Sequence, residues 1–216
     1  MNQDVLFRSD SPIHLEGYTD TDWADCPDLR RSITEAEYRA KSAASSEIFC
    51  LRRLLSKLGI LPPNIGSILP NIEELYLSVL TNLVGTIPPS ISNCSKLTIL
   101  DLSYNKLTGL IPNSFGYLTH IQRLSLGGNN LTSDSSLSFL TSLTNCRNLK
   151  FLSLSFNPLN DMLPAYTGNL STSLRTFYAN SCNIRGRIPN EVGNLSSLLK
   201  LDLSRNNMVG SIPTST

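Results

Sequence analysis

The stretch LTILDLSYNKLTGLIP, which runs from Leu97 to Pro112, decides the fold because the chain repeats it. LKFLSLSFNPLNDMLP (Leu149 to Pro164) and LLKLDLSRNNMVGSIP (Leu198 to Pro213) share its frame, L-x-x-L-x-L-x-x-N-x-L-x-G-x-I-P. Weaker copies begin at Ile72, Ile121 and Leu174. The six starts are separated by 25, 24, 28, 25 and 24 residues. A period of this length predicts a stack of similar units that share one continuous core.

The L-x-L portion of each copy predicts a short strand, because side chains two residues apart point to the same side of a strand. A strand this short is unstable alone, so we expect the six strands to pair side by side at about 4.8 Å. The predicted first column is Leu75, Leu100, Leu124, Leu152, Phe177 and Leu201. The predicted second column is Leu77, Leu102, Leu126, Leu154, Ala179 and Leu203.

The asparagine at the ninth position of the frame is predicted to turn inward, where its amide satisfies backbone groups in the bend after the strand. The residues at this position are Asn105, Asn129, Asn157 and Asn206, with Cys182 as a weak donor in the fifth copy. The first copy has one residue too many between Leu77 and Gly85, which predicts a bulge or a distorted turn.

The third copy lacks the Gly-x-Ile-Pro element and continues as TSDSSLSFLTSL, from Thr132 to Leu143. Ser133 and Asp134 stand just before leucines at positions 137, 140 and 143. This pattern predicts a capped helical turn on the outer side of the stack.

The L-x-G-x-I-P signature, present as LVGTIP, LTGLIP, IRGRIP and VGSIP, resembles the plant-specific class of leucine-rich repeat. About residues 61–216 are similar to the ectodomain of plant leucine-rich-repeat receptor-like kinases. The resemblance implies an α/β leucine-rich-repeat solenoid, right-handed and curved, with an inner parallel sheet of about six repeats and a second strand at the Gly-x-Ile-Pro edge. It also implies a non-catalytic binding scaffold in signal transduction or plant defence, with no cofactor and with a peptide, protein or partner receptor as ligand.

The inner, concave face of the expected sheet is the candidate binding surface, because aromatic and arginine side chains are the usual anchors of recognition. The candidate residues are Tyr76, Asp101, Tyr104, Arg123, Phe151, Phe156, Tyr178, Lys200, Asp202 and Arg205.

A change of composition near Leu61 predicts two segments. Charged residues make up 18 of the first 60 positions but only 17 of the following 156. In the first segment, a capping box at Ser32 and Glu35 and an apolar face ending before Gly59 predict a helix over about 33–58, after a short strand. We therefore expect domains at 1–60 and 61–216, the second truncated at its C-terminus because the chain stops inside the sixth copy.

The text GYTDTDW, RRS, ITEAEYRA and LRRLL in residues 1–60 resembles the RNase H domain of Copia-type retrotransposon polyproteins. That family holds two divalent metals with carboxylates, and Asp20 and Glu37 match two of those positions. The hairpin that the family places between Trp23 and Ile33 is deleted, and no third carboxylate motif follows. We therefore expect a vestigial fragment without nuclease activity and no metal.

The remaining chemistry is sparse. The chain has five cysteines, and the spacing of Cys94 and Cys146, two repeats apart, is too wide for a disulfide, so we expect free thiols. Asn-x-Ser/Thr sequons, which are acceptors only in the secretory route, stand at Asn93, Asn130, Asn169 and Asn194.

The formal net charge of +1 and the absence of a polybasic stretch argue against nucleic-acid binding. No signal peptide and no membrane span is recognisable, so the expected compartment is cytoplasmic by default, although the family is at the plasma membrane or extracellular. The leading hypothesis is a recognition scaffold of undetermined oligomeric state. The alternatives are a non-functional chimera, a product of two joined coding segments, a decoy partner of intact receptors, and a residual nuclease.

Overall fold

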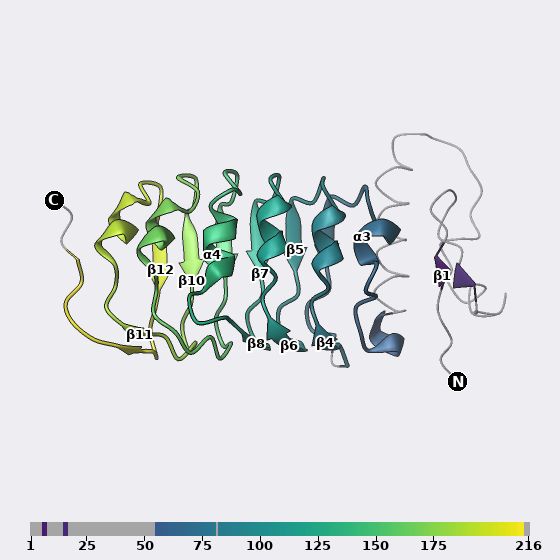
Figure 1. Cartoon of the computed structure of the whole chain (residues 1–216), viewed down its shortest axis with the longest axis horizontal. Helices are drawn as coiled ribbons and strands as arrows, with labels where there is room; N and C mark the ends of the chain where they lie inside the picture. Colours follow the sequence, from purple (N-terminus) through teal and green to yellow (C-terminus); the bar gives the residue numbers. More distant parts are fainter. Residues whose placement is uncertain (1–5, 8–14, 17–54, 81, 214–216) are drawn as a thin grey trace.

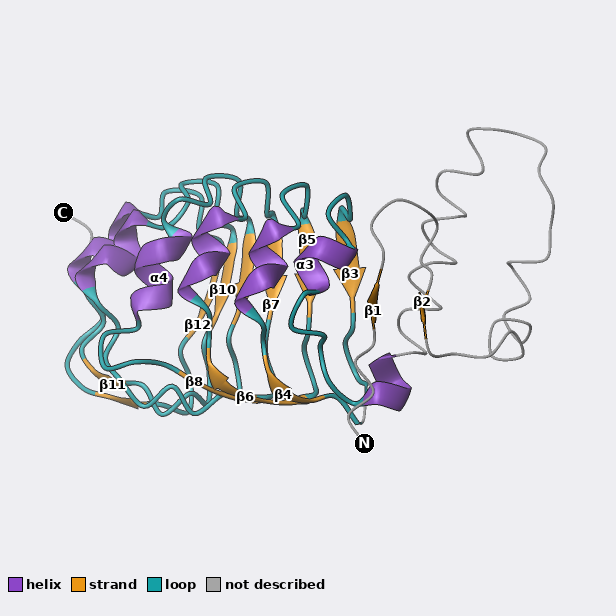
Figure 2. Ribbon diagram, turned by 45° about the vertical axis from the view of Figure 1, so that its right-hand side comes forward, coloured by secondary structure: helices purple, strands orange, loops and turns teal. Residues whose placement is uncertain are grey.

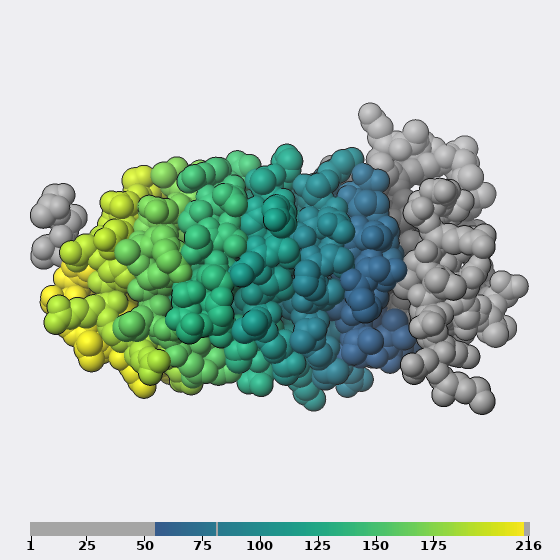
Figure 3. All heavy atoms as spheres, viewed as in Figure 1, coloured from purple at the N-terminus to yellow at the C-terminus, as the bar shows by residue number. Residues whose placement is uncertain are grey.

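The computed structural model describes residues 6–7, 15–16, 55–80 and 82–213. From residue 55 onward these form a stack of repeats, with a parallel sheet on one side and short helices on the other (Figures 1 and 2). We number the repeats one to six from the starts at positions 72, 97, 121, 149, 174 and 198. In Figure 3 the colours follow one another in bands along the long axis, because each repeat contacts only its neighbours.

The main sheet has six parallel strands in chain order, as the repeat frame predicts. Their bounds are β3 Glu74–Tyr76, β5 Ile99–Asp101, β7 Arg123–Ser125, β9 Phe151–Ser153, β10 Thr176–Tyr178 and β12 Lys200–Asp202. The pairing aligns Leu75, Leu100, Leu124, Leu152, Phe177 and Leu201 in one column. All members of this column are fully buried except Leu201, which is 39% exposed on the last strand. The expected second column is buried as far as Ala179, and Leu203 is partly buried.

A second set of strands runs along another edge of the stack, each following a main strand in the chain. They are β4 Val84–Thr86, β6 Lys106–Leu110 and β8 Asn130–Thr132 in one sheet, and β11 Arg185–Gly186 with β13 Asn207–Met208 in another. These are the second strands that the Gly-x-Ile-Pro signature implies. Strand β8 forms although its repeat lacks that signature, because its backbone pairs with the end of β6 from Thr108 to Leu110.

The outer layer consists of short helices. They are α3 Ile65–Ile68, η2 Pro89–Asn93, η3 Asn113–Tyr117, α4 Ser138–Leu143, η4 Ala165–Asn169 and η5 Asn190–Asn194. Four of them follow a proline in extended conformation, which fixes the backbone just before the helix. Helix α4 confirms the helical turn expected in the third repeat, and the Asp134 carboxylate accepts a hydrogen bond from the Ser138 N–H at 2.8 Å.

Glycine lets neighbouring outer helices approach closely. A Cβ built on Gly168 would lie 1.9 Å from the Glu191 carbonyl oxygen, and one on Gly116 would lie 2.6 Å from that of Ser142. Any larger residue at these positions would force the repeats apart on the outer side. The helices η3 and η4 therefore place glycine where the next repeat touches them.

The inward asparagines connect successive repeats, as predicted. The Asn157 amide donates to the carbonyls of Leu154, at 2.8 Å, and Leu126, at 3.0 Å, and accepts from the Leu131 N–H at 2.9 Å. Asn105, Asn129 and Asn206 make corresponding bonds. In the fifth repeat, the Cys182 thiol donates to the Leu154 carbonyl at 3.2 Å, as expected of a weak donor.

The first repeat takes up its extra residue in the turn between Leu80 and Leu83. Leu80 occupies the asparagine position, its N–H donates to Asn105 Oδ1 at 2.9 Å, and the Leu83 N–H donates to the Leu80 carbonyl. The distorted turn expected here is thus present.

The segment before the first repeat also joins the stack. Residues 55–58 are helical, Leu55 is fully buried in the core, and the Gly59 N–H donates to the Leu55 carbonyl at 2.8 Å. Gly59 has φ +72° at the helix end, and Ile60 pairs with Val84. The packed structure therefore includes residues just ahead of the expected boundary at Leu61, and the rest of the predicted 33–58 helix lies outside the described residues.

Two further strands, β1 Leu6–Phe7 and β2 Leu15–Glu16, pair antiparallel in the first segment. Asp20 and Glu37 lie outside the described residues, so the expected RNase H-like arrangement remains a prediction. Among residues 55–80 and 82–213, no helix combines the length and apolar character that a bilayer span needs.

Candidate functional site

The face of the main sheet that points away from the outer helices, here called the inner face, carries the predicted binding residues in three rows. The third frame position, at the start of each strand, holds Arg123, Phe151 and Lys200. The fifth position holds Tyr76, Asp101, Tyr178 and Asp202. The eighth position, just after each strand, holds Tyr104, Phe156 and Arg205.

The centre of the inner face is a stack of three side chains from three consecutive repeats. The Arg123 guanidinium carbon lies 3.8 Å from the centroid of the Phe151 ring. The Tyr178 ring meets Phe151 edge-on, with 5.8 Å between centroids and 85° between planes. Such cation–π and edge-to-face contacts are each worth about 0.5–1 kcal/mol on a surface, enough to hold the side chains in place before a ligand arrives.

At the first repeat, Tyr76 is surrounded by charge. Its hydroxyl donates to the Glu74 carboxylate at 3.1 Å. Partial burial, the bond to Glu74 and the charge of Glu74 raise the Tyr76 pKa, in that order of size. The charge of Asp101 raises this pKa further, and the charge of Arg123 lowers it. Glu74, Tyr76, Asp101 and Arg123 therefore share one electrostatic neighbourhood across three repeats.

The two aspartates of the fifth row bond back to their own turns. Asp101 Oδ1 accepts from the N–H of Ser103 at 3.0 Å, and Asp202 Oδ1 accepts from that of Ser204 at 2.9 Å. The hydroxyl and N–H of Ser204 lower the pKa of Asp202. Both carboxylates are thereby oriented on the inner face.

The eighth row has an unusual backbone. Val79, Tyr104, Gly128, Phe156, Ser181 and Arg205 all have φ between +54° and +69°. Side chains rarely adopt this left-handed region, and glycine occupies it in only one repeat. The conformation lets the N–H of each of these residues except Arg205, which is in the last described repeat, donate across to the next repeat just after the strand, as from Tyr104 to Gly127 at 2.8 Å. It also presents Tyr104, 64% exposed, beside Gly128, where an added Cβ would lie 2.6 Å from the tyrosine ring.

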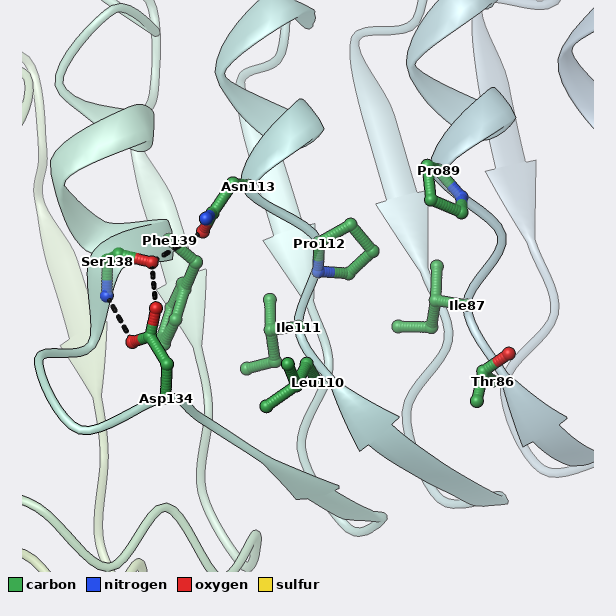
Figure 4. A pocket seen from close by; sticks show the side chains of 10 residues that line it. All are labelled: Thr86, Ile87, Pro89, Leu110, Ile111, Pro112, Asn113, Asp134, Ser138 and Phe139. Carbon is green, nitrogen blue, oxygen red and sulfur yellow. Dashed lines mark hydrogen bonds between the residues drawn. The ribbon is translucent and has the colours of Figure 1, made fainter.

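A separate hollow of about 370 Å³ lies on the outer side, between the second-edge strands and the starts of the outer helices (Figure 4). Its walls are mostly apolar, with Ile87, Leu110, Ile111 and Phe139 among them. At one end the Ser138 hydroxyl donates to Asp134 and also contacts the side-chain oxygen of Asn113. The bonds from Ser138 lower the Asp134 pKa.

The four sequons are accessible. Asn93, Asn169 and Asn194 are exposed at the ends of η2, η4 and η5, and Asn130 is exposed on β8. None lies on the inner face, so sugars at these positions would leave the inner face uncovered.

Sites for catalysis or metal binding are sparse in the part that the structure describes. Cys94, Cys146 and Cys182 are free and buried, as expected, and burial raises the pKa of each thiol to about 11. No group of three potential metal ligands is found among the described residues.

The row just before each strand is a feature that the sequence interpretation missed. It holds Glu73, Thr98, Gln122, Lys150, Arg175 and Leu199, and its backbone bonds run continuously from repeat to repeat. The Lys150 ammonium donates to the Gln122 side chain at 2.9 Å, so these two side chains are neighbours. We call this row, which borders the inner face, the rim. The signal available in the sequence was the second frame position, which the candidate binding residues do not include.

Comparison with known proteins agrees with this architecture. Sequence profiles described as leucine rich repeat match residues 70–131, 148–170, 173–195 and 197–216. Receptor-like protein 7 of Arabidopsis thaliana is 37% identical over 162 residues, which cover 74% of this chain and 16% of that protein. The LRR receptor-like serine/threonine-protein kinase EFR of the same plant is 41% identical over 83 residues, covering 38% of this chain and 8% of that protein.

Solved structures give the same result. The plant peptide hormone receptor RGFR1, in complex with RGF2, superposes with a TM-score of 0.64 at 37% identity, covering 71% of this chain and 23% of that one. The Arabidopsis receptor kinase HAESA, in complex with the peptide hormone IDA and the co-receptor SERK1, gives 0.64 at 28% identity, covering 74% and 28%. The chain thus spans well under a third of the length of these relatives.

Proposed function

Because this chain belongs to the leucine-rich-repeat family, we propose that it is a non-catalytic recognition segment that binds an extended peptide or protein segment on its inner face. The proposal extends to the role of plant receptor ectodomains, which this scaffold resembles. The relatives RGFR1 and HAESA were solved with peptide hormones bound.

The observation that carries the proposal is the stack of Arg123, Phe151 and Tyr178. It runs across three consecutive strands, so one ligand lying along the stack would contact all three side chains. Aromatic and arginine side chains that are already ordered lose little entropy on binding and are common binding hot spots.

The experiment is selection of a displayed random peptide library on the full chain, followed by capture tests with variants. A double variant, Phe151→Thr with Tyr178→Ser, removes two of the three stacked side chains. The replacements suit the sheet because Thr176 and Ser153 occupy the same rows in adjacent repeats. The control is Tyr117→Ser, since Tyr117 is 75% exposed on the outer helix η3.

We expect selected peptides to lose at least about tenfold in affinity for the double variant and to bind the control unchanged. Circular dichroism melting checks that the variants stay folded. Peptides that bind the double variant as tightly as the unmodified chain would contradict the proposed site.

For residues 1–60 we propose an RNase H-like remnant without nuclease activity, supported by the match at Asp20 and Glu37 and by the missing hairpin. The test is incubation of the full chain with an RNA–DNA hybrid and Mg²⁺ or Mn²⁺. Metal-dependent cleavage that Asp20→Asn abolishes would refute it.

A further inference from the structure

Charge is unevenly distributed along the inner face and its rim. Repeats one and two contribute the carboxylates of Glu73, Glu74 and Asp101, which are exposed or half-buried, at the second, third and fifth frame positions. No lysine or arginine stands at the second, third, fifth or eighth position of these two repeats.

Repeats three to six have the opposite sign. They contribute Arg123, Lys150, Arg175, Lys200 and Arg205 at the same frame positions, one or two in each repeat. The single carboxylate among them is Asp202 in the last repeat, which bonds to Ser204. The sign of the face therefore changes between β5 and β7, where Asp101 and Arg123 lie in adjacent strands.

Arg123 is the cation of repeats three to six whose position on the inner face is set by a stacking contact. Its guanidinium carbon lies over the Phe151 ring, 3.8 Å from the centroid, and Tyr178 contacts that ring from the next strand. A guanidinium that stacks on an aromatic ring keeps the N–H groups at its edge available to donate two hydrogen bonds to one carboxylate. The stack thus combines an apolar platform with an anion receptor.

We propose that the ligand of the inner face is an extended peptide with segregated charge. This inference rests on the proposed function and specifies its ligand. The basic end of the peptide lies over repeats one and two, an apolar or aromatic side chain packs at Phe151 and Tyr178, and the acidic end lies over repeats three to six.

The dimensions fit a short peptide. The distance from β3 to β12 is five strand spacings, or about 24 Å at about 4.8 Å each, which about seven extended residues span at about 3.3 Å per residue. The charge change lies in the second spacing and the Phe151–Tyr178 contact in the fourth, so the aromatic residue belongs just past the middle of the peptide.

The test compares two synthetic peptides of identical composition by fluorescence anisotropy on the full chain. The segregated probe is acetyl-Lys-Lys-Gly-Ser-Phe-Gly-Glu-Glu-amide with a dye on a terminal spacer. The mixed probe exchanges its second and last-but-one charged residues, which gives Lys-Glu-Gly-Ser-Phe-Gly-Lys-Glu. Both probes are neutral overall, so a difference in affinity reports the order of the charges.

We expect the segregated probe to bind about tenfold more tightly at low salt and to lose this advantage in 0.5 M NaCl, where exposed charges are screened. Glu74→Lys should weaken the segregated probe about fivefold, while Glu191→Lys, an equal change of charge on the outer helix η5, should leave it unchanged.

Equal affinities for the two probes overturn the inference, and so does failure of both to bind at 1 mM. The inference is also overturned if Glu74→Lys leaves the advantage of the segregated probe undiminished. The proposed function has its own result, because peptides from the library selection that depend on Phe151 and Tyr178 would support it whatever the order of their charges.

Discussion

Replacing Asn157 should reveal how much of the stability of the stack rests on one inward amide. Asn157 is 1% exposed and joins two repeats through three short bonds, to the carbonyls of Leu126 and Leu154 and from the N–H of Leu131. Asn157→Ala removes all three bonds and supplies no polar atom in their place.

The expected loss follows from the groups left behind. The Leu131 N–H loses its acceptor, whereas the Leu126 carbonyl keeps the Asn129 amide at 2.9 Å and the Leu154 carbonyl keeps the Cys182 thiol at 3.2 Å. A buried polar group without a partner costs about 1–3 kcal/mol, so Asn157→Ala should lower the free energy of unfolding by about 1–3 kcal/mol. That is a large share of the typical total of about 5–15 kcal/mol.

The chain itself offers a milder replacement. In the fifth repeat Cys182 stands at the same frame position and still donates to the previous repeat. Asn157→Cys should therefore retain a donor, lose the acceptor for the Leu131 N–H as alanine does, and lower the free energy of unfolding somewhat less than alanine. The exposed Asn190→Ala is the control and should change stability by less than about 0.5 kcal/mol.

Urea unfolding of the full chain, followed by far-ultraviolet circular dichroism, measures these differences. The midpoints should fall in the order control, cysteine, alanine. If Asn157→Ala lowers stability by less than about 1 kcal/mol, water or a shifted backbone satisfies the exposed groups, and the reasoning about the inward amide is wrong.

Three further changes test other contacts. Gly168→Ala should strongly lower the melting temperature because its Cβ would lie 1.9 Å from the Glu191 carbonyl oxygen, whereas Gly193→Ala, with nothing within 4 Å, should not. With Cys26 and Cys50 replaced by serine, the native chain should react with a thiol reagent at pH 8 far more slowly than the urea-unfolded chain. The reason is that burial raises the pKa of the remaining thiols, Cys94, Cys146 and Cys182, to about 11. The contribution of these buried thiols to the free energy of unfolding is complete below their unfolded pKa near 9 and is lost as pH rises toward 11. Asp134→Ala should lower the free energy of unfolding by about 1 kcal/mol, because the first turn of α4 loses the acceptor for the Ser138 N–H. In thermal melts this difference between the variant and the unmodified chain should disappear as the pH falls below 3.8, the unfolded pKa of Asp134, and through its lower folded pKa.

The frame alone predicts the elements that repeat. An apolar residue, usually leucine, at the fourth and sixth positions of the frame specifies the strand and its buried side, and an asparagine at the ninth position specifies the turn. The predicted main sheet and its register are confirmed. Cys182 fits the same frame because its thiol still donates to the previous repeat.

Other features depend on geometry that the frame does not contain. The left-handed eighth row holds valine, tyrosine, phenylalanine and arginine, which give no local signal for a positive φ. The outer hollow arises only when three repeats stand side by side.

The cation–π and edge-to-face contacts of Arg123, Phe151 and Tyr178 also bear on how the chain unfolds. In a stack of repeats, units far apart in space communicate only through those between them, so partial unfolding can begin at one end and spread. A molecule that occupies the stack of three side chains touches several units simultaneously and binds only when all of them are folded. Its binding would therefore merge their separate transitions into one, and a sharper melting curve would reveal a ligand even where the midpoint moves little.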